Sequence, residues 1–143
     1  MRFARLMTAS FLGLALAGCH GLPVVGSCSY LALYGGMNAI ESSSDNAATK
    51  AKRLDLYSIR ATVPCQMTGP SSAFTVAMAS AELKAGLQWR KAGHMSEAFR
   101  DLDDAATQAE SAAGDQTADA SARSDARDVL AQANDALNHL STK

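Results

Sequence analysis

Acidic, histidine and serine side chains are the groups in this sequence that could do chemistry, and their spacing decides which chemistry is open to them. The densest acidic group is Asp101, Asp103 and Asp104, which lacks the glycine and the terminal glutamate of a calcium-binding EF-hand loop. A helix over this stretch would aim the three carboxylates in different directions. We therefore interpret them as a solvated acidic face.

The histidines and serines form no catalytic pattern. His20, His94 and His139 have no partner at the spacing of a metal site, so we expect no bound metal. No Gly-x-Ser-x-Gly or Ser-x-x-Lys motif marks an activated serine, and no glycine-rich phosphate loop precedes a helix. We expect a protein that is not an enzyme and that holds no noncovalent cofactor.

The first residues have the organisation of an export signal. Arg2 and Arg5 make a positive start, and the apolar run that follows is too short to span a bilayer comfortably. The run ends at residues 16–19, Leu-Ala-Gly-Cys, a segment that resembles the lipobox of bacterial lipoproteins. In that family, small residues before the cut let the backbone enter a protease site, and the thiol corresponding to Cys19 accepts a diacylglycerol.

The resemblance implies that residues 1–18 are a signal peptide and that the mature chain starts at lipidated Cys19. Cleavage would free the Cys19 amine for a further acyl chain, and several chains anchor a protein stably where one is marginal. The alternative is an ordinary cysteine behind a conventional signal peptide. In enterobacterial sorting, an aspartate directly after the lipidated cysteine favours retention in the inner membrane. Here that residue is His20, which favours the outer membrane and a domain that faces the periplasm. Residues 19–27 would form the tether, and residues 28–143 the domain.

Two cysteines remain once Cys19 is assigned to lipid. Cys28 and Cys65 would lie in a compartment where disulfides persist, and we predict that they bond to each other. Closing a loop of about 37 residues would stabilise the fold by roughly 3 to 4 kcal/mol. Two buried free thiols or a redox pair are the alternatives, although the sequence has no Cys-x-x-Cys motif.

The composition favours helices. Removing 18 of the 143 residues leaves 125, which is enough for one modest core. Apolar residues make up 48% of the chain, much of it alanine, and no stretch alternates polar and apolar residues for long enough to indicate a strand. We therefore expect an all-α fold, a small irregular bundle of about four helices with one disulfide.

Two segments before Pro64 carry helix signals. Residues 28–41 could form a helix, but the glycine pair in the middle weakens it. Ser44 or Asp45 can cap a second helix, which runs to about Thr62. The break around Pro64 separates both segments from the rest of the chain.

Three longer helical segments follow. The first runs from a cap at Ser71 or Ser72 to Gly93, the second over residues 94–113 and the third over residues 115–140. Each has apolar residues three and four positions apart, which predicts that one face of each helix packs against a core. In the first of these helices, Glu82 is expected to lie largely off that face. The stripes are Phe74, Ala77, Met78, Ala81, Ala85 and Trp89; then Met95, Ala98, Phe99, Leu102, Ala106 and Ala109; then Ala118, Ala122, Ala126, Val129, Ala133, Leu137 and Leu140.

Between Glu82 and Glu110 the spacing of small and aromatic residues is similar to one tetratricopeptide repeat. Residues 88–98 carry most of the likeness, in which small residues let two antiparallel helices approach closely. No second copy lies about 34 residues away in either direction, and a stable array needs about three repeats. A single helical hairpin within a bundle is the other interpretation of this segment.

Charge is distributed unevenly along the chain. The formal net charge is −1, and loss of the two arginines of the signal makes it −3. Residues 19–100 have eight basic and five acidic side chains, whereas residues 101–143 have three basic and nine acidic ones. The basic group at residues 50–60 lacks interleaved aromatic residues that could stack on bases, so we expect no nucleic-acid partner.

Two functions of different class fit these patterns. The first is a non-catalytic, membrane-anchored envelope lipoprotein that binds a protein partner or helps to assemble an envelope complex. Its candidate contact residues are Trp89, Phe99, Asp101 and Asp104. The alternative is a carrier or enzyme accessory that holds a small apolar ligand between its helices. The side chains that would line that pocket are Met67, Phe74, Met78, Trp89 and Phe99.

Overall fold

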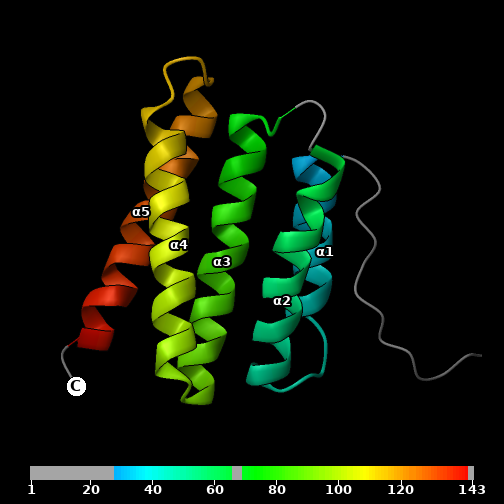
Figure 1. Cartoon of the computed structure of the whole chain (residues 1–143), viewed down its shortest axis with the longest axis vertical. Coiled ribbons are helices and arrows are strands. Elements are labelled where there is room, and N and C mark those ends of the chain that lie inside the picture. Colours follow the sequence, from blue (N-terminus) through cyan, green and yellow to red (C-terminus); the bar gives the residue numbers. More distant parts are fainter. Residues whose placement is uncertain (1–27, 66–68, 142–143) are drawn as a thin grey trace, which may run out of the picture.

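The computed structural model describes residues 28–65 and 69–141, which form five α-helices and one short 3-10 helix. The elements are α1 (Tyr30–Glu41), α2 (Ala47–Ala61), η1 (Val63–Cys65), α3 (Ser72–Ala92), α4 (Met95–Gly114) and α5 (Ala120–Ser141). Successive α-helices run in opposite directions (Figure 1). The expected all-α fold is confirmed, whereas the expected number of about four helices is one too low. The predicted signal peptide and tether lie outside the described residues.

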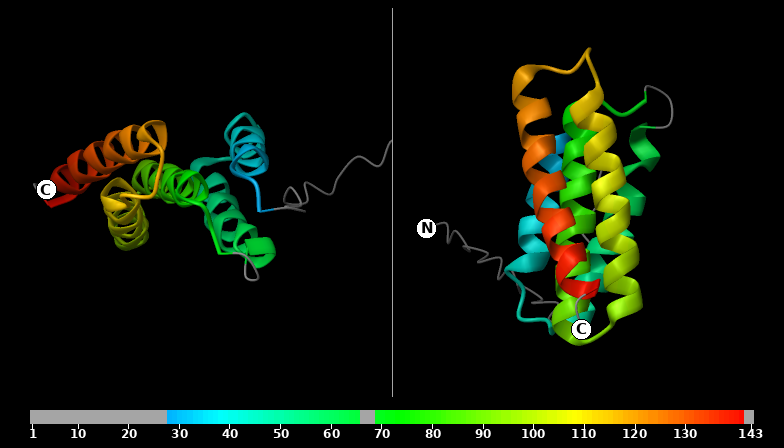
Figure 2. Two further views of the ribbon diagram at one scale, coloured as in Figure 1. Left: turned by 90° about the horizontal axis from the view of Figure 1, so that it is seen from above. Right: turned by 90° about the vertical axis from the view of Figure 1, so that its left-hand side faces the viewer.

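α3 is the central helix of the fold. It packs against α1, α2, α4 and α5, and seen from above it lies between the α1–α2 pair and the α4–α5 pair (Figure 2). Its buried residues therefore surround the helix axis and are not confined to the single face that the sequence predicts. Neighbours on all sides also explain how a polar residue such as Glu82 comes to be buried.

α1 forms despite its glycine pair. This helix is the one by which the expected number of helices was too low. A Cβ on Gly36 would overlap the hydroxyl group and ring of Tyr57, so the Tyr57 ring of α2 packs directly on the α1 backbone. The Tyr57 hydroxyl donates to the Ala32 carbonyl oxygen at 3.0 Å. Glycine within a helix costs about 0.5 to 1 kcal/mol relative to alanine. Burial of Tyr57, which is 1% exposed, offsets that cost.

α3 and α4 form a close hairpin. A Cβ on Gly86 would lie 2.7 Å from Leu102 Cγ and 3.2 Å from the Ala98 carbonyl oxygen, so the two helices approach where α3 has no side chain. Gly93 ends α3 in the left-handed conformation, with φ of 84°. The shared core of α3, α4 and α5 is built mainly of alanine, which is compatible with such short distances between helices.

Two helix starts differ from the expectation. Asn46 caps α2, one residue beyond the expected positions 44–45, and its Oδ1 accepts from the Thr49 N–H at 2.9 Å. α5 begins only at Ala120, after Asp119, whose carboxylate accepts from a backbone N–H of the first turn at 2.7 Å.

Asp115 explains the late start of α5. Its carboxylate accepts hydrogen bonds from the Ser72 hydroxyl and from the hydroxyl and N–H of Thr117, the latter at 2.8 Å. These hydrogen bonds lower the pKa of Asp115 to about 2. Asp115 therefore holds the loop between α4 and α5 against the start of α3 and does not begin a helix.

Candidate functional site

The predicted disulfide is present. Cys28 and Cys65 are bonded, with their Cα atoms 5.0 Å apart, which ties the residues just before α1 to the end of η1. Cys65 is 3% exposed and belongs to the core shared by α1, α2 and α3. Since the chain has three cysteines, the pairing leaves Cys19, which lies outside the described residues, as the one cysteine without a place in this disulfide.

The four residues expected to contact a partner do not form one surface. Trp89 and Asp101 are buried, at 7% and 0% exposure, whereas Phe99 is 52% exposed and Asp104 is exposed. Ala98 and Leu102 fill the α4 side of the close α3–α4 interface, at 0% exposure, whereas Phe99 lies outside it. Phe99 and Asp104 are therefore accessible to a partner, and Trp89 and Asp101 belong to the interior.

Asp101 is part of a buried acidic cluster, which we define as Asp55 of α2, Glu82 of α3 and Asp101 of α4. One carboxylate oxygen from each residue lies within 4.8 Å of those of the other two. Glu82 and Asp101 are buried, and Asp55 is half-buried. This corrects two expectations: Asp101 does not lie on a solvated face, and Glu82 does not lie off the packed surface of α3.

Arg100 and Ser58 bond to one oxygen atom of each carboxylate in this cluster. Arg100 donates to Asp101 Oδ1 from Nε at 2.9 Å and from Nη2 at 2.7 Å, and its Nη2 lies 3.3 Å from Asp55 Oδ2. Ser58 Oγ donates to Glu82 Oε1 at 2.5 Å and to the Asp55 carbonyl oxygen at 2.8 Å. Asp101 Oδ2 is buried and has no hydrogen-bond partner among the described residues.

Burial changes how tightly the cluster holds protons. It raises the pKa of Glu82 to about 7; the Ser58 hydrogen bond opposes this, and the charges of Asp101 and Asp55 reinforce it. Burial also raises the pKa of Asp101, against the hydrogen bond and charge of Arg100. Ser58 has one hydroxyl hydrogen for two acceptors. When Glu82 is protonated, its own carboxyl hydrogen is donated to Ser58 Oγ. The Ser58 hydroxyl hydrogen is then free to bond to the Asp55 carbonyl oxygen.

The geometry favours a structural role for the cluster over a catalytic one. Three carboxylates at this spacing are ligands that Mg²⁺ or Ca²⁺ accepts. Arg100, however, already contacts two of the three, so a cation would have to displace its guanidinium group. As it stands, the cluster joins α2, α3 and α4 through polar contacts whose strength depends on pH.

Asp55, Ser58 and Glu82 were not identified from the sequence. Asp55 and Ser58 are three residues apart and share one side of α2. Glu82 lies four residues before Gly86, on the side of α3 that meets α4. The spacing of Glu82 relative to Gly86 is the signal that could have placed it at a helix interface.

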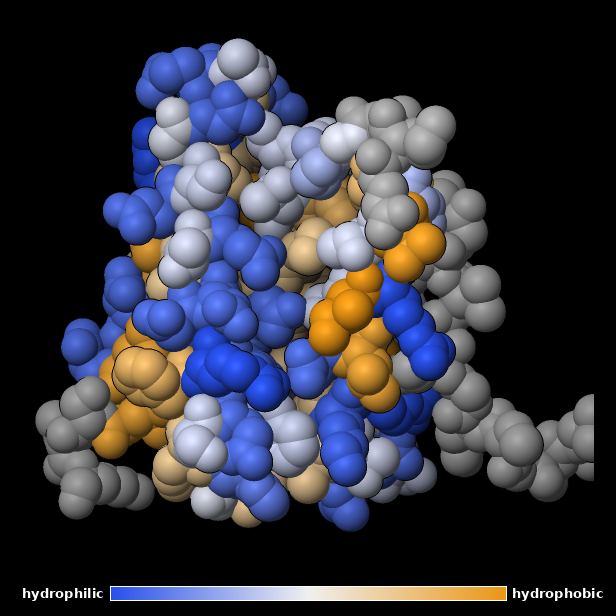
Figure 3. Space-filling view, viewed as in Figure 1, coloured by the Kyte–Doolittle hydropathy of each residue, from blue (hydrophilic) through white to orange (hydrophobic). Residues whose placement is uncertain are grey.

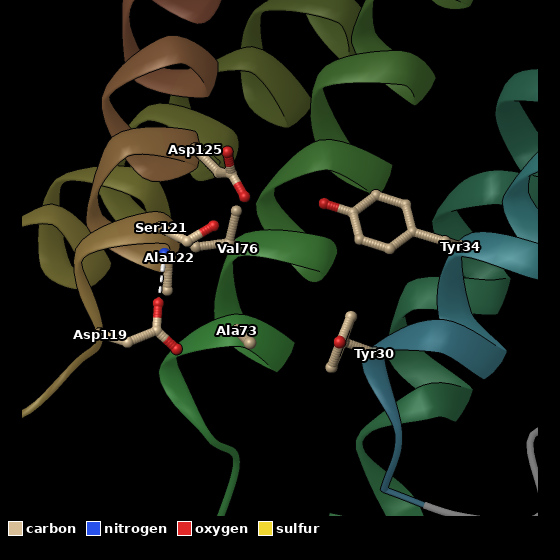
Figure 4. Close-up of a pocket in the computed structure, with 8 residues that line it drawn as sticks. All are labelled: Tyr30, Tyr34, Ala73, Val76, Asp119, Ser121, Ala122 and Asp125. Atoms are coloured by element: carbon tan, nitrogen blue, oxygen red, sulfur yellow. Dashed lines mark hydrogen bonds between the residues drawn. The ribbon is translucent and has the colours of Figure 1, made fainter.

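A small cavity lies on the other side of α3, between α1 and α5. Figure 4 shows Tyr30 and Tyr34 of α1 facing Ser121 and Asp125 of α5, with Val76 of α3 between them. The cavity volume is about 150 Å³, below the roughly 300 Å³ at which small-molecule sites begin. The cavity is therefore a poor fit for a drug-sized ligand.

The residues expected to line an apolar ligand pocket lie in different places. Phe74 and Met78 pack in the core shared by α1, α2 and α3, and Trp89 packs between α2 and α4. Phe99 is exposed, and Met67 lies outside the described residues. No cavity in the described part of the chain is lined by these side chains together.

No protein-family model, no curated protein and no solved structure matches this chain. A proposal about function therefore depends on the chain's own residues.

Proposed function

We propose that this chain is a lipid-anchored, non-catalytic protein of the bacterial cell envelope, which binds another envelope protein. The observation that carries the proposal is the arrangement of its cysteines: residues 16–19 resemble a lipobox, and the disulfide uses Cys28 and Cys65. Cys19 would then carry diacylglycerol on its thiol and an acyl chain on its amine. His20 after it favours the outer membrane. None of the helices within residues 28–65 and 69–141 combines the length and the hydropathy that a membrane span requires.

We propose the acidic layer as the surface that binds the partner. We define this layer as the exposed carboxylates of α4, α5 and the loop between them, a region (residues 95–141) with ten acidic and three basic residues. A surface of one sign attracts and orients a protein of the opposite sign. The partner is therefore a protein with a basic surface on the periplasmic side. The layer comprises Asp103, Asp104, Glu110, Asp119, Asp125, Asp128 and Asp135.

Replacing Cys19 with alanine tests the anchor. Cells fed an alkyne analogue of palmitate should label the wild-type chain and leave the Cys19→Ala chain unlabelled, because that variant lacks the thiol that begins lipidation. The matched control replaces Cys28 and Cys65 with alanine, which should keep the label. Equal labelling of wild type and Cys19→Ala would contradict the anchor.

Neutralising the acidic layer tests the partner surface. A photo-crosslinking residue at Ala131, which is exposed in the middle of α5, should capture the partner in the envelope. Changing Asp125, Asp128 and Asp135 to asparagine should lower that yield roughly tenfold, because attraction between opposite charges speeds association. Added salt should lower the wild-type yield in the same direction.

The control for this experiment changes three exposed neutral residues of the same region, Gln116, Gln132 and Asn134, to alanine. It should leave the crosslinking yield unchanged. A yield that stays constant when the three aspartates are neutralised would show that the acidic layer does not bind the partner.

A further inference from the structure

The exposed side of α2 has a stripe of apolar and basic residues, which we define as Lys52, Leu56, Ile59, Arg60 and Val63. The three apolar side chains are 44%, 58% and 59% exposed, and spacings of three and four residues place the stripe on one side of α2 and η1. Figure 3 shows apolar side chains gathered over the upper half of α2. The two basic residues are exposed and form no ion pair within the described ranges.

The fold does not need this stripe for its core. α2 packs on the rest of the domain through another side, where Leu54, Tyr57 and Ala61 are 0% to 1% exposed. Several large apolar side chains together on a surface indicate a site of interaction. The stripe is therefore available for contact with something outside the domain.

The predicted tether leaves the domain beside the stripe. Val63 is two residues from Cys65, whose disulfide holds Cys28, and the eight residues 20–27 lead from there back to Cys19. That length of chain spans roughly 30 Å at full extension, whereas the stripe is roughly 16 Å long at the helical rise. A lipid on Cys19 would keep the whole stripe within reach of the bilayer surface.

We propose that α2 docks through this stripe on the anionic phospholipid surface of the membrane that holds the anchor. This inference rests on the lipidation of Cys19 proposed above. Leu56, Ile59 and Val63 enter the boundary between headgroups and acyl chains, as apolar residues of interfacial helices do. Lys52 and Arg60 lie against the headgroup phosphates, which attract basic side chains.

The orientation that follows agrees with the proposed partner surface. α2 and α5 lie towards opposite edges of the domain (Figure 1), and they belong to different helix pairs around α3 (Figure 2). Docking of α2 therefore places the basic part of the domain on the membrane. α5, which carries Asp125, Asp128 and Asp135 of the acidic layer, then lies at the other edge of the domain and stays open to a protein in the periplasm.

The depth of a fluorophore in the bilayer tests this docking. The full lipidated chain is reconstituted into vesicles of phosphatidylglycerol and phosphatidylcholine, with a polarity-sensitive fluorophore on Ile59→Cys or, as the matched control, on Ala131→Cys of α5. We expect the emission from position 59 to move to the blue, with quenching by iodide reduced roughly threefold or more. Emission from position 131 should match that of the label in water.

Charge variants separate docking from mere proximity to the membrane. Lys52→Gln with Arg60→Gln should lower the ratio of docked to undocked protein roughly 10- to 30-fold, since an anionic surface contributes about a factor of five for each cation. Vesicles of phosphatidylcholine alone should produce a similar loss. Lys91→Gln with Arg127→Gln removes the same charge at exposed positions on other helices and should dock like the wild type.

Each contrary outcome has a distinct meaning. If the protein floats with the vesicles while the label at position 59 is as accessible to iodide as the label at position 131, docking is overturned and the anchor stands. If the wild-type protein does not float, the anchor fails and docking fails with it. If position 59 becomes buried only when envelope proteins are added, the stripe is a protein interface and the inference is wrong.

Discussion

Replacing both Cys28 and Cys65 with alanine should lower the free energy of unfolding by about 3 to 4 kcal/mol. The disulfide joins residues separated by 37 positions, and without it the unfolded chain gains conformational freedom that folding must then remove. α1 should loosen first, because the glycine pair weakens this helix and the disulfide holds the residue at its start. Urea unfolding of the detergent-solubilised chain, followed by far-ultraviolet circular dichroism, measures the change.

Reduction provides the matched control for this variant. A reducing agent should lower the unfolding free energy of the wild type by a similar amount and leave the double variant unchanged. If oxidised wild type and double variant unfold with equal free energy, the disulfide does not stabilise the domain.

The free energy of unfolding should also fall by about 3 kcal/mol as the pH rises from about 4.5 to about 7. The cause is the loss of a proton from Glu82. Burial raises the pKa of this residue from 4.5 to about 7, so in that window the folded state holds a proton that the unfolded chain has released. The stabilisation is fully present below pH 4.5, is lost as the pH rises, and is absent above about pH 7.

Glu82→Gln isolates this effect, because glutamine has nearly the same shape and can still bond to Ser58 but does not titrate. The variant should match the wild type near pH 4 to within about 1 kcal/mol and exceed its stability above pH 7 by about 3 kcal/mol. Glu110→Gln, at an exposed position of α4, is the matched control and should follow the wild type. Identical pH profiles for Glu82→Gln and wild type would mean that the pKa of Glu82 is not raised.

Other charged groups near Glu82 will leave a residual pH dependence. Asp55, Asp101 and Asp104 act on it through their charges, and burial raises the pKa of Asp101 as well. Arg100 pairs with Asp101 and Asp55 and remains charged throughout this range. The difference in stability between wild type and Glu82→Gln therefore measures the titration of Glu82. The slope of wild-type stability against pH measures the titration of all these charged groups together.

The sequence was sufficient where the structural signal is local. Ser71 caps α3 through the Phe74 N–H at 3.2 Å, and Gly93 ends the helix in a conformation that glycine adopts readily. Both features depend on residues within one turn of the helix end. The Cys28–Cys65 bond was also predictable, because the lipobox resemblance left an even pair.

The sequence was insufficient where a residue's role depends on a distant neighbour. Gly36 weakens α1 in isolation, and the helix forms because Tyr57 packs on its backbone and because Leu33, Met37 and Ile40 are buried in the core. Likewise, periodicity assigns charged residues to solvent, but Glu82 lies on a helix with neighbours on all sides. Met95 and Phe99 fit the expected apolar stripe of α4, yet they are 47% and 52% exposed, whereas Leu102 of the same helix is buried against α3.

The lipid anchor is best tested by the intact mass of the protein extracted from native membranes, before and after reduction, for wild type and Cys19→Ala. Wild type should have the mass of residues 19–143 plus a diacylglycerol and an acyl chain, and reduction should add two hydrogens as the disulfide opens. The Cys19→Ala chain should lack the lipid mass. A wild-type chain without lipid would contradict the proposed anchor, and the domain would then have to be considered without a membrane attachment at Cys19.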